Sequence, residues 1–397
     1  MRILQLRKWL SARDDSGGKI RASGLARALS CFAQVDAIGF SSDSEATLRT
    51  APCLAHYGAV YPITPKGPAA RAPRLAIEVG RGHSLRSANF ASAVYRRRVS
   101  AAVAEKDYDA IQVEELSMVA NLPAPAPVPV VYSGHNVESA LATKLLRARG
   151  PWLKALGPVE RRRTLVEERD ALRRAVFSLA VSQADKVELE TIGGGRCSPI
   201  HVVPNCAGDD LAPSDLALGR AAQPHRIVFA ACFSWFPNME AARWFLADVH
   251  PHLRRGGPPS VVHFVGSGLD PALARAIEAA GCVAHRDVPD LRPHLDGARI
   301  AMVPLRSGGG TRLKIVEAWA SGVPVVSTVL GAAGLGGVDG VDLLLADAPA
   351  AFAAQLRRVL LDDALYHRLR ENGLRRAASM RWSQQAPLLA ALYATLK

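Results

Sequence analysis

The sequence predicts a protein of two α/β domains in series, each built around a parallel sheet with helices on both faces. The chain has 397 residues, and at about 150 residues per domain this length indicates two or three domains. Short β-rich runs alternate with helix-like segments, which is the pattern of parallel sheets joined by crossover helices. The stretch at 206–225 is rich in Pro, Gly and Asp and lacks periodicity, so it is the best candidate for a domain boundary.

Each expected strand is a short β-rich run between helix-like segments. In chain order these runs cover residues 2–6, 35–40, 110–113, 128–132, 177–181, 227–231, 261–265, 300–303 and 323–327. A helix is expected at 20–32 and a loop at 61–73. The final 45 residues have a helical pattern throughout, and Trp382 opens the last helix.

The composition excludes several classes of protein. Hydrophobic residues make up 49% and charged residues 21% of the chain, which is typical of soluble globular proteins and excludes a disordered or fibrous chain. No run approaches the ~18 apolar residues of a membrane helix, and Arg7 and Lys8 interrupt the first apolar run, so no signal peptide is expected. The 6 cysteines form no CxxC pair and no metal-ligand spacing. Free thiols in a reducing compartment, a cytoplasmic location and no metal centre are therefore predicted.

The net charge of +13 is unevenly distributed. Residues 1–200 carry 29 basic and 19 acidic side chains, whereas residues 201–350 carry 12 and 14. A basic surface attracts polyanions or an anionic membrane surface; the alternative is a solvated, Arg-rich surface without a partner. Nucleic-acid-binding surfaces usually interleave aromatic residues with the charge. The most basic stretch, 51–100, has only 4 aromatic residues, so no nucleic acid is expected as a partner.

Open parallel sheets bind ligands at the loops that leave the carboxyl ends of their strands, and three such loops carry informative residues. The first, at 16–19, contains Gly17 and Gly18 just before a predicted helix. Two glycines let a ligand approach the backbone, and the helix N-terminus supplies free amides and positive potential. The loop lacks the Walker pattern, and an ordinary tight turn is the alternative.

The second loop, which reads GGGTRLKIVE at 308–317, is the strongest local signal. Arg312 and Lys314 are expected in the first turn of a helix that Thr311 can cap, although the helix dipole disfavours cations there. Their position is favourable if a dianionic ligand such as a diphosphate binds beside them. Glu317 follows Lys314 by three residues, so both side chains project from one helical face. A surface salt bridge between them is the alternative.

The third loop follows the expected strand at 128–132 and contains His135. A histidine at the carboxyl end of a strand can act as a base or as a hydrogen-bond donor near neutral pH. A purely structural histidine is the alternative.

Several of these segments together resemble the retaining glycosyltransferases of family four, which have the GT-B fold. The family's C-terminal signature is similar to the segment MVPLRSGGGTRLKIVEAWASGVPVVSTVLGAAGL of this chain. The start of the same family domain is similar to the segment IVFAACFSWFPNMEAARWF. In this family one strand leads into the interdomain linker, and that strand resembles the segment IHVVPN of this chain. The family's acceptor-side glycine loop and histidine match SGGKIRASGLARAL and YSGHNVES.

The resemblance implies an architecture of two Rossmann-like, doubly wound domains that face each other across a cleft. It implies an acceptor-side domain at 1–205, a linker at 206–225, a nucleotide-sugar-binding domain at 226–380, and a final helix at 381–397 that packs back on the first domain. One departure concerns Gly309, which stands where the family's Glu-x7-Glu motif has its first glutamate. A branch with the pattern GxGTRLKxxEA shares this replacement.

The resemblance also implies an activity. A sugar would move from a nucleoside diphosphate sugar, with retention of configuration and without a metal or other cofactor. The acceptor would be a glycan, a lipid-linked molecule or a small molecule, in cell-envelope or exopolysaccharide assembly, with possible attachment to the inner face of a membrane. By position, Glu317 would bind the donor ribose, Arg312 and Lys314 the diphosphate, and His135 would lie near the sugar and acceptor. The remaining donor and phosphate contacts would come from Gly17, Gly18, Gly309, Gly310 and Thr311.

Three other functions stay open from the sequence. The first is a glycosyltransferase for natural products or other small molecules. The second is a sugar-nucleotide epimerase, which needs acid and base carboxylates in its cleft, and the sequence shows no clear carboxylate pair there. The third is a non-catalytic polyanion-binding protein, which the basic charge favours.

Overall fold

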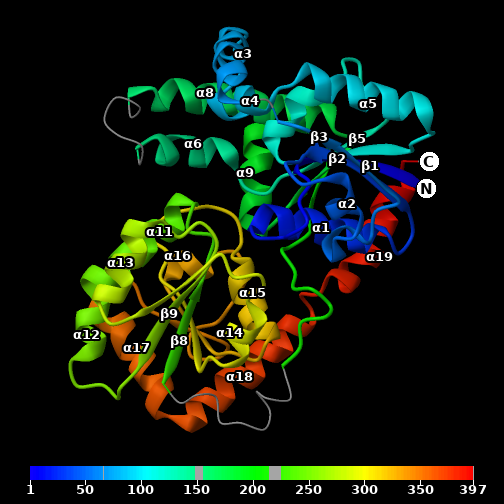
Figure 1. Ribbon diagram of the computed structural model, residues 1–397. Helices are drawn as coiled ribbons and strands as arrows, with labels where there is room; N and C mark the ends of the chain where they lie inside the picture. Colours follow the sequence, from blue (N-terminus) through cyan, green and yellow to red (C-terminus); the bar gives the residue numbers. More distant parts are fainter. Residues whose placement is uncertain (66, 148–154, 214–224, 397) are drawn as a thin grey trace. The chain divides into compact units, whose positions relative to one another are not determined.

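The computed structural model describes residues 1–65, 67–147, 155–213 and 225–396 and divides into two compact units (Figure 1). The first unit comprises Met1–Pro204 and Ser383–Lys397, and the second comprises Asn205–Trp382. Each unit has its own parallel sheet. The expected class of two doubly wound α/β domains is therefore confirmed.

The first unit contains a seven-stranded sheet in the order β3-β2-β1-β4-β5-β6-β7, and all its pairs are parallel. The strands are β1 (Arg2–Trp9), β2 (Gln34–Phe40), β3 (Ala59–Ile63), β4 (Ala110–Glu114), β5 (Val130–Ser133), β6 (Phe177–Ala180) and β7 (Ile200–Val202). The order runs outward in both directions from β1 and β4, so these two strands form the switch point where ligands of such sheets bind. Gly18 follows β1 and Glu115 follows β4 along the chain, so both lie next to this switch point.

Helices cover both faces of this sheet. They are α1 (Gly17–Leu29), α2 (Glu45–Arg49), η1 (Pro52–Leu54), α3 (Pro68–Gly80), α4 (Leu85–Phe90), α5 (Ala93–Glu105), η2 (Leu116–Asn121), α6 (Glu138–Arg147), α8 (Gly157–Arg174), α9 (Gln183–Gly193) and the final helix α19 (Trp382–Ala394). The buried ring of Tyr393 in α19 lies 5.3 Å from the ring of Phe177 in β6. Its hydroxyl donates a hydrogen bond to Gln112 in β4. The chain therefore returns to its first sheet at its end.

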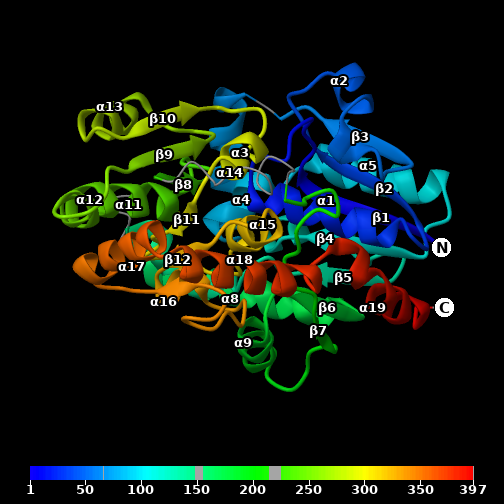
Figure 2. The same cartoon turned by 90° about the horizontal axis from the view of Figure 1, so that it is seen from below.

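The second unit contains a six-stranded parallel sheet in the order β10-β9-β8-β11-β12-β13 (Figure 2). Its strands are β8 (Arg226–Ala230), β9 (Val261–Gly266), β10 (Val283–Arg286), β11 (Ile300–Val303), β12 (Val325–Ser327) and β13 (Leu344–Leu345). Its helices are α11 (Phe236–Trp244), the π-helical segment η3 (Phe245–Val249), α12 (His250–Arg254), α13 (Pro271–Ala279), α14 (Arg292–Asp296), α15 (Leu313–Ala320), α16 (Val329–Ala332), α17 (Pro349–Leu361) and α18 (Asp363–Ala378). The switch point here lies between β8 and β11.

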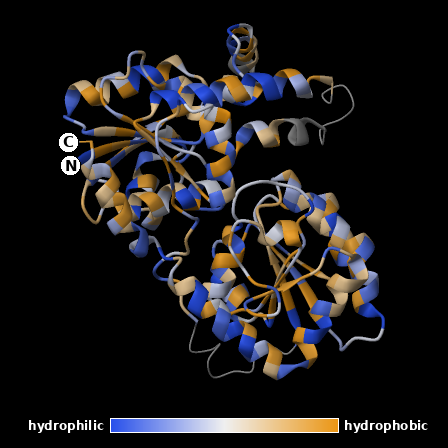
Figure 3. Ribbon diagram, turned by 180° about the vertical axis from the view of Figure 1, so that it is seen from behind, coloured by the Kyte–Doolittle hydropathy of each residue, from blue (hydrophilic) through white to orange (hydrophobic). Residues whose placement is uncertain are grey.

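Apolar side chains fill the space between this second sheet and its helices, and the strands are mostly hydrophobic (Figure 3). Trp319 of α15 is fully buried, and its indole N–H donates to the carbonyl of Asp342 at 2.9 Å. Gly373 of α18 lies against this ring, since a Cβ there would come within 2.6 Å of the indole. The helix that carries Lys314 and Glu317 is thus fixed from behind by close packing.

Two expectations about the chain path need correction or restriction. The stretch at 61–73 is not a loop, because β3 ends at Ile63 and α3 starts at Pro68. Residues 205–213 belong to the second unit rather than to a free linker: Cys206 and Ala207 are fully buried, and the Ala207 N–H donates to the Met380 carbonyl. The remainder of the expected linker, 214–224, lies outside the described residues. No helix in the described part of the chain has the length and apolar character needed to cross a membrane.

Candidate active site

The two glycines after β1 form the first turn of α1 rather than a separate loop. Ser16 is the N-cap residue in an extended conformation, and Gly17 is the first helical residue. A Cβ atom on Gly18 would lie 2.9 Å from Oε1 of Glu115 and 3.5 Å from Nδ1 of His135. Glycine at position 18 therefore leaves room for two polar side chains that come from the neighbouring strands β4 and β5.

His135 follows β5 and is held by a carboxylate. Its Nε2 lies 2.7 Å from Oε2 of Glu114, and the histidine is 8% exposed. Burial alone would raise the pKa of Glu114, but the hydrogen bond with His135 and the charge of Arg21 keep this pKa below its usual range. The structure thus pairs His135 with a buried, ionised carboxylate.

Glu115 lies on the other side of His135, with its Oε1 3.7 Å from Nδ1. Its backbone has a φ of 69°, a left-handed conformation that is uncommon outside glycine. Its Oε2 lies 3.4 Å from Nζ of Lys8 and 3.2 Å from the guanidinium of Arg86. Burial acts to raise the pKa of Glu115, yet Lys8, His135 and Arg86 together lower it to about 2. Glu115 is therefore a permanently charged acceptor at neutral pH.

These carboxylates correct one expectation. The sequence shows no clear carboxylate pair of the kind that an epimerase needs in its cleft, whereas in the structure Glu114 and Glu115 flank His135 directly. Sequence reasoning also missed Lys8 and Arg86. The available signal was the Glu-Glu pair at the carboxyl end of a predicted strand.

In the second unit, the glycine loop after β11 depends on backbone conformations that favour glycine. Gly308 has a φ of 120° and Gly310 a φ of 69°. Arg312 turns back over the loop and donates to the carbonyls of Gly309 and Gly310, the latter at 2.8 Å. Arg312, not Thr311, is the N-cap residue of α15, and no side chain caps this helix. The expected cap at Thr311 is therefore wrong, and the buried Thr311 hydroxyl has no hydrogen-bond partner among the described residues.

Lys314 and Glu317 lie one turn apart on α15. Nζ of Lys314 donates to Oδ1 of Asn238 at 2.8 Å and lies 4.7 Å from the centre of the Phe229 ring. Burial, helped by the charge of Arg312, lowers the pKa of Lys314 to about 7. Burial also raises the pKa of Glu317 to about 7, against the attraction of Lys314. Both groups can therefore change charge near neutral pH when a ligand alters their surroundings.

Asn238 lies in the first turn of α11, the helix that follows β8, and was not predicted as a site residue. Its Nδ2 donates to the Cys232 carbonyl at 2.7 Å, so its Oδ1 is fixed toward Lys314. The neighbouring Gly266 has a φ of 145°, and a Cβ there would lie 1.9 Å from the Ala231 carbonyl oxygen. The loops after β8, β9 and β11 thus meet at the carboxyl edge of the second sheet.

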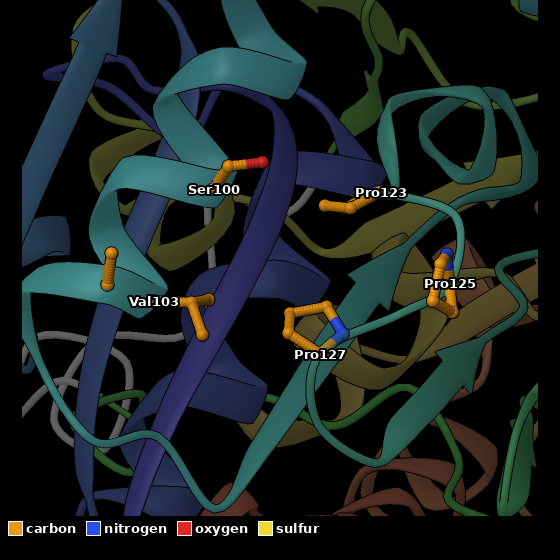
Figure 4. Close-up of a pocket in the computed structure, with 6 residues that line it drawn as sticks. Ser100, Val103, Pro123, Pro125 and Pro127 are labelled. Carbon is orange, nitrogen blue, oxygen red and sulfur yellow. The ribbon is translucent and has the colours of Figure 1, made fainter.

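A separate depression lies in the first unit between α5 and the loop that precedes β5 (Figure 4). It is lined mostly by apolar residues, namely Ser100, Val103, Ala104, Pro123, Pro125 and Pro127. This loop enters the sheet at the amino ends of the strands, away from Gly18 and His135. It offers a ligand few polar partners.

Comparison with solved structures identifies the fold of the chain. The chain aligns over 100% of its length with sucrose-phosphate synthase from Thermosynechococcus elongatus, covering 99% of that chain at 16% identity and a TM-score of 0.71. It aligns over 98% of its length with Anabaena Alr3699/HepE in complex with UDP and glucose, covering 99% of that chain at 18% identity and a TM-score of 0.66. A pneumococcal O-GlcNAc transferase, GtfA, in complex with UDP and GlcNAc gives 10% identity and a TM-score of 0.66 over 100% of this chain and 99% of that one. The protein accordingly has the fold of the GT-B glycosyltransferases.

The sequence of the second unit gives the narrower assignment. Residues 224–362 match the family described as glycosyl transferases group 1, so this unit is a group 1 glycosyltransferase domain. One curated relative, an uncharacterized 44.6 kDa protein in the cps region of Klebsiella pneumoniae, is 28% identical over 127 residues. That match covers 30% of this chain and 33% of the relative, so the chain spans about a third of the length of the curated relative that it matches.

Proposed function

We propose that this protein is a glycosyltransferase that uses a UDP-sugar, and that Lys314 binds the diphosphate of this donor. The observation that carries the proposal is the position of Lys314. It is a partly buried lysine in the first turn of α15, beside a glycine loop, with Nζ held 2.8 Å from an uncharged amide. A cation there is disfavoured by burial and by the helix dipole unless an anion joins it. A diphosphate supplies that anion and can also use the free amides of the helix.

The rest of the site fits the same ligand. Glu317 projects from the same face as Lys314 and can accept hydrogen bonds from ribose hydroxyls. Arg312 donates to the carbonyls of Gly309 and Gly310, which stabilises the loop around Gly308. Transfer leaves a nucleoside diphosphate, and fixed cations and amides stabilise the charge that develops on it. His135 and Gly18 of the first unit are proposed to serve the transferred sugar or the acceptor.

The proposed acceptor belongs to polysaccharide assembly. The match to a protein encoded in a cps region supports this assignment. The basic charge of the first half supports an anionic acceptor or an anionic membrane surface as partner. Helix α8 offers a surface of this kind, because Arg161, Arg162, Val159 and Val166 are exposed on it.

The donor assignment is tested by replacing Lys314 with alanine. Lys314→Ala should weaken UDP binding by about 1.5–3 kcal/mol, which is roughly 10- to 150-fold in Kd. Binding of uridine should change little, because uridine lacks the diphosphate. Isothermal titration calorimetry with both ligands measures the difference.

The matched control is Arg306→Ala. Arg306 is an exposed cation of the same loop region, 5.0 Å from the Trp244 ring centre, and in the described part of the chain it forms no hydrogen bond or ion pair with the α15 site. Its loss should leave UDP affinity within about twofold. Equal losses for UDP and uridine in Lys314→Ala would reject the diphosphate role, and the absence of UDP binding in the unmodified protein would reject the donor.

A further inference from the structure

A chain of hydrogen bonds with a fixed direction ends at His135. It starts at the Ala22 carbonyl, which can only accept, so the group of Gln5 that lies 3.1 Å away must be the amide nitrogen. The same nitrogen lies 2.8 Å from Oε1 of Glu114. The other end of this amide, Oε1 of Gln5, accepts from the hydroxyl of Tyr57. Gln5 therefore donates to Glu114.

A second glutamine repeats this arrangement from the opposite side. Oε1 of Gln112 accepts from the Tyr393 hydroxyl of α19, and its Nε2 donates to the same Oε1 of Glu114. The amide groups of Gln5 and Gln112 thus both donate to Oε1 of Glu114. Because both are donors, only an acceptor such as an oxygen can occupy the position of Oε1. The second oxygen, Oε2, is left for Nε2 of His135 at 2.7 Å. Because this carboxylate accepts, Nε2 of His135 must carry the hydrogen.

The other ring nitrogen, Nδ1, faces the site. It is buried and has no hydrogen-bond partner among the described residues. It lies 3.5 Å from where a Cβ of Gly18 would be and 3.7 Å from Oε1 of Glu115. When His135 is neutral and its proton is on Nε2, Nδ1 presents a lone pair that can accept a hydrogen bond.

We propose that Glu114 is a positioning residue that holds the proton of His135 on Nε2, so that Nδ1 and Glu115 form a pair of acceptors for neighbouring hydroxyl groups of a sugar. This inference rests on the proposed function and extends it to the first unit. A pair of acceptors about 3.7 Å apart suits two adjacent ring hydroxyls, each of which donates one hydrogen bond. Lys8 and Arg86 contact the other oxygen of Glu115, which keeps its Oε1 available as an acceptor.

Glu114→Gln provides a direct test, because the network dictates how the new amide must lie. Gln5 and Gln112 both donate toward the position of Oε1, so the amide oxygen takes that place and the amide NH2 faces His135. An NH2 group donates, so Nε2 must then accept and the histidine proton moves to Nδ1. The variant keeps the shape of the side chain and inverts the tautomer.

Long-range ¹H–¹⁵N NMR of histidine-labelled full-length protein distinguishes the two tautomers without any ligand. We expect Nε2–H in the unmodified protein and Nδ1–H in Glu114→Gln. Asp36→Asn is the control, since Asp36 is a fully buried carboxylate nearer the amino ends of the strands that bonds Lys106 and Tyr108. It should leave the His135 signals unchanged. Nδ1–H in the unmodified protein, or the same tautomer in Glu114→Gln, would overturn the proposal.

The same nuclei report on the sugar. A shift of the Nδ1 signal with UDP-glucose but not with UDP assigns the hydroxyl groups to the donor sugar. A shift with methyl α-glucoside in the presence of UDP assigns them to the acceptor. No shift with either probe would overturn the hydroxyl pair.

Measurements of activity distinguish a positioning role of Glu114 from a purely structural role in folding. Glu114→Gln should lower UDP-glucose turnover at least tenfold while the Kd for UDP stays within twofold, because UDP is held by the second unit. Unchanged turnover with an inverted tautomer would contradict the role of Nδ1. A protein that binds no UDP at all would instead refute the proposed donor, and the tautomer result would stand separately.

Discussion

Lys314 and Glu317 lie one turn apart in α15, and burial acts on their charges in opposite directions. Removal from water disfavours the charged form of both groups, so the pKa of the lysine falls to about 7 and that of the carboxyl rises to about 7. A bound diphosphate adds negative charge near the lysine, which favours the ammonium form. Ribose hydroxyls that donate to Glu317 favour the carboxylate form.

The pH dependence of UDP binding follows from these two shifts. Above pH 7, Lys314 of the ligand-free protein loses its proton. Binding of UDP must then be accompanied by uptake of a proton at Lys314, so the affinity for UDP falls as the pH rises. Below pH 7 free Glu317 gains a proton that binding must release, so affinity falls as the pH drops. Calorimetry in buffers of different ionisation enthalpy should therefore show net proton uptake at pH 8.

Glu317→Gln isolates the lysine in this experiment. The variant should lose the contribution that Glu317 makes below pH 7 and keep the decline above it. The ionisation of UDP itself is common to both proteins and cancels in the comparison. Identical pH profiles for the variant and the unmodified protein would contradict the role of Glu317.

Lys314 and Glu317 also show which part of the site could be predicted from the sequence. The pair Lys314 and Glu317 follows from a spacing of three within one helix, which is local information. Asn238 holds Lys314 from 76 residues away, and their contact exists only because β8 and β11 are neighbours in the sheet. Glu114 and His135 meet for the same reason across β4 and β5. To predict long-range pairs of this kind, one must know the order of the strands in the sheet, and local residue patterns do not contain that order.

At the scale of elements, central strands were predicted well and edge strands were not. β8 and β11 are covered on both faces and have continuous apolar runs, and β1 and β4 are buried along most of their length. The edge strand β3 contains Pro62 and is only half-buried, and the edge strand β10 reads VAHR. Edge strands tolerate proline and polar residues because one side is unpaired. Their sequences therefore lack the pattern that identifies a strand.

The edge of the second sheet also carries a histidine cluster. Nδ1 of His263 in β9 lies 2.9 Å from Nε2 of His285 in β10, and the ring of His294 in α14 lies 4.6 Å from that of His285. Arg226 lies 3.1 Å from Nδ1 of His294. Burial and the neighbouring positive groups lower the pKa of all three histidines, that of His263 to about 4.

Acid should therefore destabilise this edge. The unfolded chain takes up a proton at each histidine below about pH 6.5, whereas folded His263 resists protonation until about pH 4. Its contribution to stability is complete above pH 6.5 and is lost as the pH falls from there toward 4. His263→Gln should reduce the loss between pH 7 and pH 5 by about 1 kcal/mol, after allowance for partial exposure.

Urea unfolding followed by tryptophan fluorescence measures this loss at both pH values. His252→Gln serves as the control, because His252 belongs to the same unit and its side chain lies outside the cluster. A pH-dependent loss in His263→Gln that equals that of the control would contradict the cluster's role.

At the scale of the whole molecule, the first unit is built from two distant segments of chain. Helix α19 supplies buried side chains to a sheet whose strands end at Val202. Sequence patterns predicted the helix itself. Its attachment to the first unit came from the family resemblance, since periodicity does not tell which sheet a helix will cover.

Two adjacent leucines of α19 test this attachment. Leu389 is fully buried, whereas Leu388 is 39% exposed. Leu389→Asp places an unpaired charge in the core and should destabilise the first unit by about 3–5 kcal/mol, while Leu388→Asp should change stability by about 0.5 kcal/mol or less. Hydrogen exchange should rise across β4–β7 in Leu389→Asp and stay unchanged across β8–β12. Uniformly faster exchange in both units would contradict the division.

The discontinuity of the first unit also sets an order of assembly during synthesis. Residues 205–382 are translated before α19, so the second unit has its complete sequence while the first still lacks a helix. At about 5–20 residues per second this delay is roughly 10–35 s. During that interval the side of β6 that Tyr393 later covers is open to solvent or to chaperones. The part of the protein that is made first is therefore the last to be finished.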